Sequence, residues 1–235
     1  MTRRDATPTG VPSAHRRDSA VLGVAVGVFG ITFGVLASTS GLSIAQACVM
    51  SLLVFTGASQ FAAVGIIGSG GDPAAAVGSA LLLGARNGAY AMSLNRLLPR
   101  SKWRRALAAQ LVIDESMAMA LVQENDDHAR EALFITGGMV FIFWNLGTLL
   151  GALSGEAIGD PEAWGLDAAF PAGFITFVLP HLNRRPALVS ALVGGTVAML
   201  AVPLTPAGAP IVLAVAGALA GYVALQRTPT AETDP

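Results

Sequence analysis

Apolar stretches, most of them uncharged, are separated by short polar segments along most of the chain. The first two, Ser19 to Leu42 and Ser43 to Gly71, are each long enough to cross a hydrocarbon core of ~30 Å as a helix that rises ~1.5 Å per residue. The later stretches are, in order, 73–98, 106–123, 132–155, 168–180 and 186–226, the last being split near several prolines. The pattern predicts an all-α polytopic membrane helical bundle with about 6 to 8 membrane segments.

The two ends of the chain are polar. Residues 1–18 hold several arginines among Pro, Thr and Ser, and residues 227–235 follow the last apolar stretch. We expect a disordered cytoplasmic N-terminal tail, a transmembrane transporter domain over 19–226 and a short C-terminal tail. A secretory signal is the alternative for the N-terminus, but the apolar stretch after it exceeds the ~7 to 15 residues of a signal core and has no clear cleavage site.

Composition supports an integral membrane protein. Of the 235 residues, 53% are hydrophobic and 12% charged, and the mean hydropathy is +0.62. The single cysteine excludes a disulfide within the chain, and no basic patch for nucleic acid is present. The three histidines lack metal-ligand spacing and no phosphate-binding loop occurs, so we expect no enzyme activity, metal or cofactor. Glycines predict a stripe of close helix packing in the first stretch: Gly23, Gly27, Gly30 and Gly34.

The centre of the second stretch is polar. Thr56, Gly57, Ser59 and Gln60 stand where lipid tails would accept only apolar groups, and such a segment is tolerated only where it is buried in protein or lines a water-filled cavity. We therefore predict two half-helices, with free N–H groups near Gly57 that bind an anion such as a carboxylate. The alternative is that Ser59 and Gln60 only join two helices by hydrogen bonds.

Basic residues constrain how the stretches thread. If every stretch crossed the membrane, the basic cluster from Arg96 to Arg105 would lie outside, against the tendency of arginine and lysine to remain cytoplasmic. If the stretches 43–71 and 168–180 instead enter and return on one side, this cluster and both termini are cytoplasmic. The result is two halves of opposite orientation, the inverted-repeat plan of many secondary transporters.

Polar and charged residues also lie inside two apolar stretches. Arg86 and Asn87 interrupt the third stretch, and Asp114 and Glu115 lie at the centre of the fourth. A charge costs about 2.5 to 3.5 kcal/mol at the centre of a membrane helix, so such residues pair with each other or face a water path. Either Arg86 and Asp114 form a structural ion pair, or Arg86 binds a substrate carboxylate while Asp114 or Glu115 binds an ammonium group or carries a proton.

The sequence VFTGASQFAAV, residues 54–64, is similar to the signature of the AzlC family, the large subunit of two-component branched-chain amino acid exporters. Residues 81–87 leading to Tyr90, 114–116 and 165–167 agree in order and spacing, and the resemblance extends over roughly 19–222.

The chain departs from the pattern of this family at two places. Residues 84–87 read Gly-Ala-Arg-Asn where Asn-Leu-Arg-His is common, and Ile113 replaces a Thr before the Asp-Glu pair. Arg86, Asp114 and Glu115 are in place.

The resemblance implies a gradient-driven exporter of branched-chain or other small aliphatic amino acids in the bacterial cytoplasmic (inner) membrane. It also implies a small AzlD-like membrane subunit as partner, and a homo-oligomer is left open. The alternatives are a transporter of a different small solute and a non-transporting membrane scaffold. Asp114 and Glu115 are expected to couple transport to protons or ions. The predicted substrate-binding residues are Phe55, Thr56, Gly57, Ala58, Ser59, Gln60, Phe61, Arg86, Asn87, Phe170 and Phe174. For the phenylalanines, the alternative is a plain core or lipid-facing position.

Overall fold

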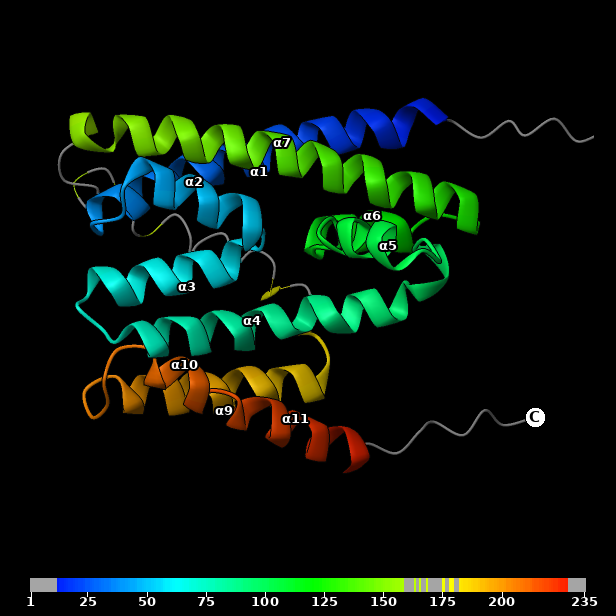
Figure 1. Ribbon diagram of the computed structural model, residues 1–235. Coiled ribbons are helices and arrows are strands. Elements are labelled where there is room, and N and C mark those ends of the chain that lie inside the picture. Colours follow the sequence, from blue (N-terminus) through cyan, green and yellow to red (C-terminus); the bar gives the residue numbers. More distant parts are fainter. Residues whose placement is uncertain are drawn as a thin grey trace, which may run out of the picture. The chain divides into compact units, whose positions relative to one another are not determined.

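The computed structural model describes residues 12–158 and 182–227, together with residues 163, 165, 168, 175, 178 and 179. Every regular element in this part of the chain is a helix (Figure 1). Among the described residues, three segments are long and apolar enough to cross a membrane: Arg16–Thr39, Asp126–Gly155 and Ala209–Gln226. The predicted all-α membrane helical bundle is therefore confirmed.

The helices belong to two compact units. The first unit comprises Met1–Val28 and Asn87–Trp144, and the second comprises Phe29–Arg86 and Asn145–Pro235. Three helices contribute to both units: α1 (Pro12–Thr39), α4 (Pro73–Ser93) and α7 (Asp126–Ile158). The first unit adds η1 (Asn95–Leu97), α5 (Lys102–Ala109) and α6 (Asp114–Leu121). The second unit adds α2 (Ile44–Leu53), α3 (Gly57–Gly68), α9 (Arg185–Ala201), α10 (Ala209–Leu213) and α11 (Ala216–Arg227).

The first helix begins before the apolar stretch that predicted it. α1 starts at Pro12, a residue type that suits the first turn because its missing N–H would have no intrahelical acceptor. Nε of Arg16 donates to Oε1 of Glu131 at 3.0 Å, and the hydroxyls of Ser19 and Thr136 lie 2.8 Å apart. Residues 12–18, predicted as part of a disordered tail, are therefore helical, and residues 1–11 lie outside the described part.

Glycines bring α1 and α7 into backbone contact, as the stripe in the first stretch predicts. In the first unit, a Cβ added to Gly27 would lie 3.0 Å from Cβ of Phe143. In the second unit, a Cβ added to Gly34 would lie 2.6 Å from the backbone N of Ala152. Lipid tails supply no hydrophobic force between helices, so this close approach provides the van der Waals contact that holds the two helices together.

The second apolar stretch is broken and returns to the side it entered from. In the second unit, a Cβ added to Gly68 at the end of α3 would lie 3.2 Å from Cβ of Ser40, which precedes α2. Helices α2 and α3 have 10 and 12 residues, so each reaches about half way through a core of ~30 Å. The prediction of a broken, re-entrant pair at 43–71 is confirmed.

The fourth stretch, predicted as one span over 106–123, is a second broken pair. In the first unit, α5 ends at Ala109 and α6 begins at Asp114. Both ends of the pair lie against the segment after α4, because Arg105 hydrogen-bonds Asn95 and Nε of Arg96 lies 2.7 Å from Oδ1 of Asp126. The chain therefore returns to the end it left, and the single-span prediction is wrong. The other predicted re-entrant stretch, 168–180, lies almost entirely outside the described residues.

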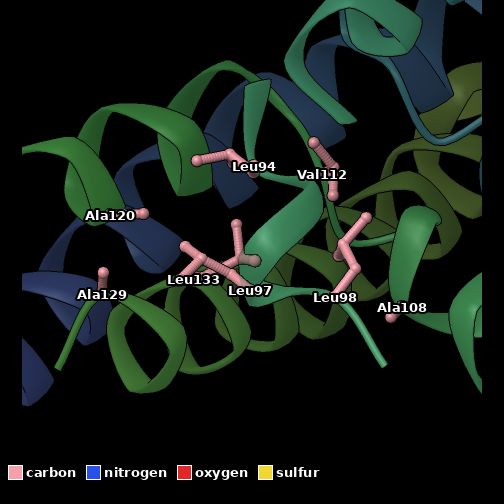
Figure 2. Packing of buried hydrophobic residues seen from close by; sticks show 8 residues of the cluster. All are labelled: Leu94, Leu97, Leu98, Ala108, Val112, Ala120, Ala129 and Leu133. Atoms are coloured by element: carbon pink, nitrogen blue, oxygen red, sulfur yellow. The ribbon is translucent and has the colours of Figure 1, made fainter. Parts of the chain in front are cut away.

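A cluster of buried apolar side chains holds the second broken pair in place (Figure 2). It joins the segment after α4 to α5, α6 and the start of α7. Its members are Leu94, Leu97, Leu98, Ala108, Val112, Ala120, Ala129 and Leu133. Because the pair packs on protein along this face, its two short helices need not span the bilayer to be stable.

The last helices pack through glycines as well. The split near the prolines of the stretch 186–226 is confirmed, because α9 ends at Ala201 and α10 begins at Ala209. Gly208 at the turn has φ +92°, a conformation that side chains other than glycine rarely adopt. A Cβ added to Gly217 of α11 would lie 2.6 Å from the backbone N of Gly194 in α9, so the two backbones touch.

We predict opposite effects of alanine at two glycines of these helices. Gly217→Ala should destabilise the protein by about 1 to 3 kcal/mol, because the new methyl group overlaps the backbone of α9. Gly195→Ala should be neutral or stabilise by up to about 1 kcal/mol, because a Cβ at Gly195 meets nothing within 4 Å and alanine favours the helix. Thermal unfolding in detergent measures both, and equal shifts in Tm would contradict the glycine contact.

Candidate functional site

The break between α2 and α3 begins at a well-fixed helix. Ser43 and Gln46 form a capping box at the start of α2, in which Ser43 N donates to Oε1 of Gln46 at 2.8 Å and Gln46 N donates to Oγ of Ser43 at 3.2 Å. α2 ends at Leu53, and Val54 N closes its last turn by donating to Met50 O at 2.9 Å. The first half-helix therefore has a defined start and end.

The second half-helix starts without a cap. Thr56 is extended, with φ −156° and ψ 107°, and its side chain makes no capping hydrogen bond. The first helical hydrogen bond runs from Gln60 N to Thr56 O at 3.2 Å. Helix geometry leaves the N–H groups of Gly57, Ala58 and Ser59 without intrahelical acceptors, and Ala58 and Ser59 are buried. The positive end of α3 is thus enclosed in protein.

Ser59 joins two helices. Its hydroxyl donates to Ala80 O of α4 at 2.8 Å, and a Cβ added to Gly84 would lie 3.4 Å from the same hydroxyl oxygen. Ala80 and Gly84 belong to the part of α4 that lies in the second unit, where α4 runs beside α3 (Figure 1). The hydroxyl of Ser59 therefore joins α3 to α4 by a hydrogen bond, as one of the two interpretations of the sequence expected.

Gln60 is only half satisfied. Its side chain is 0% exposed, and Nε2 donates to Met50 O at 3.3 Å. Because Met50 O is an acceptor, the amide nitrogen must face it, which fixes the orientation of the amide. Oε1 of Gln60 then has no hydrogen-bond partner among the described residues. A buried carbonyl oxygen without a donor is unfavourable by about 1 to 3 kcal/mol, which favours a site for a donor that arrives from outside the chain.

The aromatic residues near the break are buried. Phe61 packs edge to face against Phe33 of α1, with ring centroids 5.7 Å apart and an interplanar angle of 74°. Phe55 is buried in the extended segment between α2 and α3. Phe61 therefore contributes to the core of the second unit, and Phe55 lies within the break itself. Phe170 and Phe174, also predicted at the site, lie outside the described residues.

Arg86 and Asn87 lie next to each other on α4. Both residues are partly buried. Along α4, Arg86 is the last residue assigned to the second unit and Asn87 the first assigned to the first unit. Oδ1 of Asn87 is buried and has no hydrogen-bond partner in the described part of the chain. These two residues are thus held inside the helical bundle rather than solvated at a helix end.

Asp114 and Glu115 begin a helix instead of lying at the centre of a span. Both are partly buried in the first turn of α6, where the positive end of the helix dipole stabilises a negative charge. The hydroxyl of Tyr90 on α4 donates to Oδ1 of Asp114 at 2.9 Å. The carboxylate of Asp114 is thus oriented by a hydrogen bond from α4.

Ser116 forms hydrogen bonds with the backbone just before α6. It is buried, its Oγ accepts a hydrogen bond from Ile113 N at 3.0 Å, and its hydroxyl lies 2.7 Å from Leu111 O. Ser116 stands at the third position of α6, as Ser59 does in α3, yet Ser59 bonds to another helix. Ser116 therefore bonds the backbone just before its own helix, whereas Ser59 bonds a neighbouring helix.

Sequence reasoning missed two partners at these sites. Met50 supplies the carbonyl that orients Gln60, and a backbone role of this kind leaves no trace in residue type. Tyr90 donates a hydrogen bond to Asp114. Its position on the same helix as Arg86, four residues later, is the one sequence feature that could have indicated a role at the site. No cluster of three or more His, Cys, Asp or Glu that could hold a metal occurs among the described residues.

We predict that Tyr90→Phe lowers the free energy of unfolding by about 0.5 to 1.5 kcal/mol, because it removes the hydroxyl bonded to Asp114. Tyr222→Phe is the matched control, since Tyr222 is exposed on α11 and should be neutral. Thermal unfolding of both variants makes the comparison. If Tyr90→Phe behaves like the control, the bond to Asp114 does not stabilise the fold.

Comparison with known proteins places the chain in a family. The family model described as AzlC protein matches residues 21–158, which include both helix breaks. Residues 165–167, part of the resemblance noted from the sequence, lie beyond that match. No solved structure matches the chain significantly.

Several relatives cover most of the chain. Inner membrane protein YgaZ of Escherichia coli (strain K12) is 30% identical over 172 residues, 69% of this chain and 70% of its own length. An uncharacterized membrane protein of Archaeoglobus fulgidus is 32% identical over 174 residues, 72% and 74% of the two chains. Another from Helicobacter pylori (strain J99) is 26% identical over 179 residues, 75% and 78%. With more than half of its length matched by the family model, this chain belongs to the AzlC family of membrane proteins.

Proposed function

We propose that this protein exports branched-chain or other small aliphatic amino acids, with the substrate bound at the break between α2 and α3. One observation carries the proposal, namely the buried, uncapped start of α3 next to the unpartnered Oε1 of Gln60. A helix start offers N–H donors and partial positive charge, and an amide oxygen offers an acceptor. An amino acid has a carboxylate that suits the N–H donors and an ammonium group that suits the amide oxygen.

The size and polarity of the break fit a small aliphatic side chain. Gly57 and Ala58 have little bulk, and Phe55 is a buried apolar neighbour in the extended segment. Ser59 is bonded to α4 and is not needed for the substrate. The site therefore combines two polar anchors with apolar surroundings, as small-molecule sites generally do.

The driving force would come from an ion or proton gradient. Asp114 at the start of α6, bonded to Tyr90, is the residue we assign to proton or ion coupling, with Glu115 beside it. Arg86 is assigned to the substrate carboxylate during transport. Re-entrant half-helices that meet near the middle of the membrane are common in secondary transporters, where one repeat moves against the other.

Membership of the AzlC family supports two further proposals. The first is a bacterial inner-membrane location with cytoplasmic termini, which the basic residues of the Arg96 to Arg105 cluster favour. The second is a small AzlD-like membrane subunit as partner. The 18-residue apolar segment Ala209–Gln226 is only 11% buried, so it offers surface to lipid or to such a subunit.

Two alternatives remain distinct from this proposal. A different small solute is favoured by Gly84 and Asn87, which replace larger or basic residues common in the family next to Arg86. A non-transporting scaffold would use its polar residues only for assembly. The unpartnered oxygen of Gln60 disfavours a scaffold, because a purely structural role would be served as well by an apolar residue.

We predict that Gln60→Met abolishes efflux or raises KM at least tenfold, because it removes the amide while keeping the length of the side chain. Gln123→Met is the matched control, since the Gln123 amide also bonds a backbone carbonyl, Met119 O at 3.0 Å, but lies at the end of α6. Purified protein in liposomes, with and without the partner subunit, is scored for efflux of a panel of amino acids. Normal efflux by Gln60→Met would place the substrate elsewhere.

We predict that Arg86→Ala abolishes export while the protein still inserts into the membrane. The physical reason is the loss of the guanidinium that would bind the substrate carboxylate as a bidentate pair. Arg17→Ala, at an exposed position near the start of α1, is the control and should export normally. Export at the normal rate by Arg86→Ala would assign a structural role to Arg86.

A further inference from the structure

A pocket of about 580 Å³ lies in the first unit, whereas the helix break at α3 belongs to the second unit. It is formed by the segment after α4, the start of α5 and the start of α7. Its lining combines four arginines with apolar residues and one asparagine: Arg96, Arg100, Arg105, Arg130, Leu97, Leu98, Pro99, Phe134 and Asn95. No acidic residue lines it, so the pocket concentrates positive charge.

Three of the arginines are held in place by the protein. Nε of Arg130 donates to Leu97 O at 3.0 Å, Arg96 pairs with Asp126, and Arg105 hydrogen-bonds Asn95. Arg130 also lies 3.7 Å from Asp127, an exposed and therefore weak pair. These contacts use only part of each guanidinium, which has five N–H donors, so further donors remain for a ligand.

Arg100 is different from the other three. Its side chain makes no hydrogen bond or ion pair with any residue that the structure describes, although Asn95, Arg96 and Arg105 line the same pocket. A free guanidinium beside three other arginines is electrostatically unfavourable unless an anion lies between them. The pocket therefore has the composition of an anion site.

The apolar side of the pocket is the packed core of the first unit. Leu97 and Leu98 are buried members of the cluster in Figure 2, and Phe134 packs against that cluster. A rigid apolar wall beside several cations suits an amphiphile with a charged head and an acyl chain. A fully hydrated small anion would gain nothing from this wall.

The composition of α5, which contributes Arg105 to the pocket, is typical of a helix at a membrane interface. α5 presents Trp103 and Leu107, 72% and 56% exposed, together with the basic residues Lys102, Arg104 and Arg105. Exposed tryptophan and leucine beside lysine and arginine are typical of a short helix that lies among lipid headgroups. This composition of α5 favours a place for the pocket near the headgroup phosphates.

We propose that this pocket binds the headgroup of an anionic phospholipid, with the phosphodiester contacting Arg100 and its neighbouring arginines and an acyl chain running along Leu98 and Phe134. Basic pockets on the cytoplasmic side of membrane helices bind such headgroups. The bound lipid neutralises the arginine cluster and ties the second re-entrant pair to the bilayer.

Native mass spectrometry of the delipidated full chain, titrated with phosphatidylglycerol, tests the proposal. Arg100→Gln should weaken binding about fivefold, the effect expected for one basic residue near anionic lipid. Arg104→Gln removes the same charge from the same segment outside the pocket lining and should leave the affinity unchanged. Two further titrations use phosphatidylcholine in place of phosphatidylglycerol, and inorganic phosphate added to the complex with phosphatidylglycerol.

Selective loss with Arg100→Gln, weak binding of phosphatidylcholine and no competition by inorganic phosphate would support the lipid site. Equal weakening by Arg100→Gln and Arg104→Gln would overturn it in favour of general attraction to the basic segment. Phosphatidylcholine binding as tightly as phosphatidylglycerol would also overturn it. Displacement of phosphatidylglycerol by inorganic phosphate would assign the pocket to free phosphate.

Discussion

The hydrocarbon core of a membrane contains no water to satisfy backbone amides, and this constraint governs both helix breaks of the protein. An interrupted helix is stable there only if protein groups or a ligand take up the freed N–H and C=O groups. At the start of α6, Ser116 bonds Ile113 N and Leu111 O. At the start of α3, the serine in the same position bonds α4 instead. The serine hydroxyl thus serves the break itself at α6 and a neighbouring helix at α3.

The two breaks share a local pattern but differ in their hydrogen bonds. Gly57 to Gln60 and Asp114 to Met117 both follow an extended residue and carry serine at the third helical position. What differs is where the serine hydroxyl points and whether a buried acceptor is left over, as it is at Gln60. Within each unit, close glycine contacts hold α1 against α7.

Much of the fold follows from the sequence, since charge gaps, prolines and the polar centre of 43–71 indicate the helices, the split after α9 and the first broken pair. The second pair was missed because 106–123 contains no glycine or proline. Asp114 and Glu115 indicate the break, because acidic residues are typical of a helix start, but they were interpreted as buried charges at the middle of a span. For the site, residue types identified Gln60, but the Ser59 bond to Ala80 and the carbonyl of Met50 depend on tertiary contacts that no single-chain pattern encodes.

The re-entrant pair α2–α3 also sets an order of assembly. Neither half-helix, at 10 and 12 residues, is long enough to partition into the bilayer as a span, whereas α1 can do so alone. Ser59 reaches its acceptor, Ala80, only after α4 has been synthesised. The contact that joins α3 to α4 therefore forms late, after both flanking helices, α1 and α4, have been made.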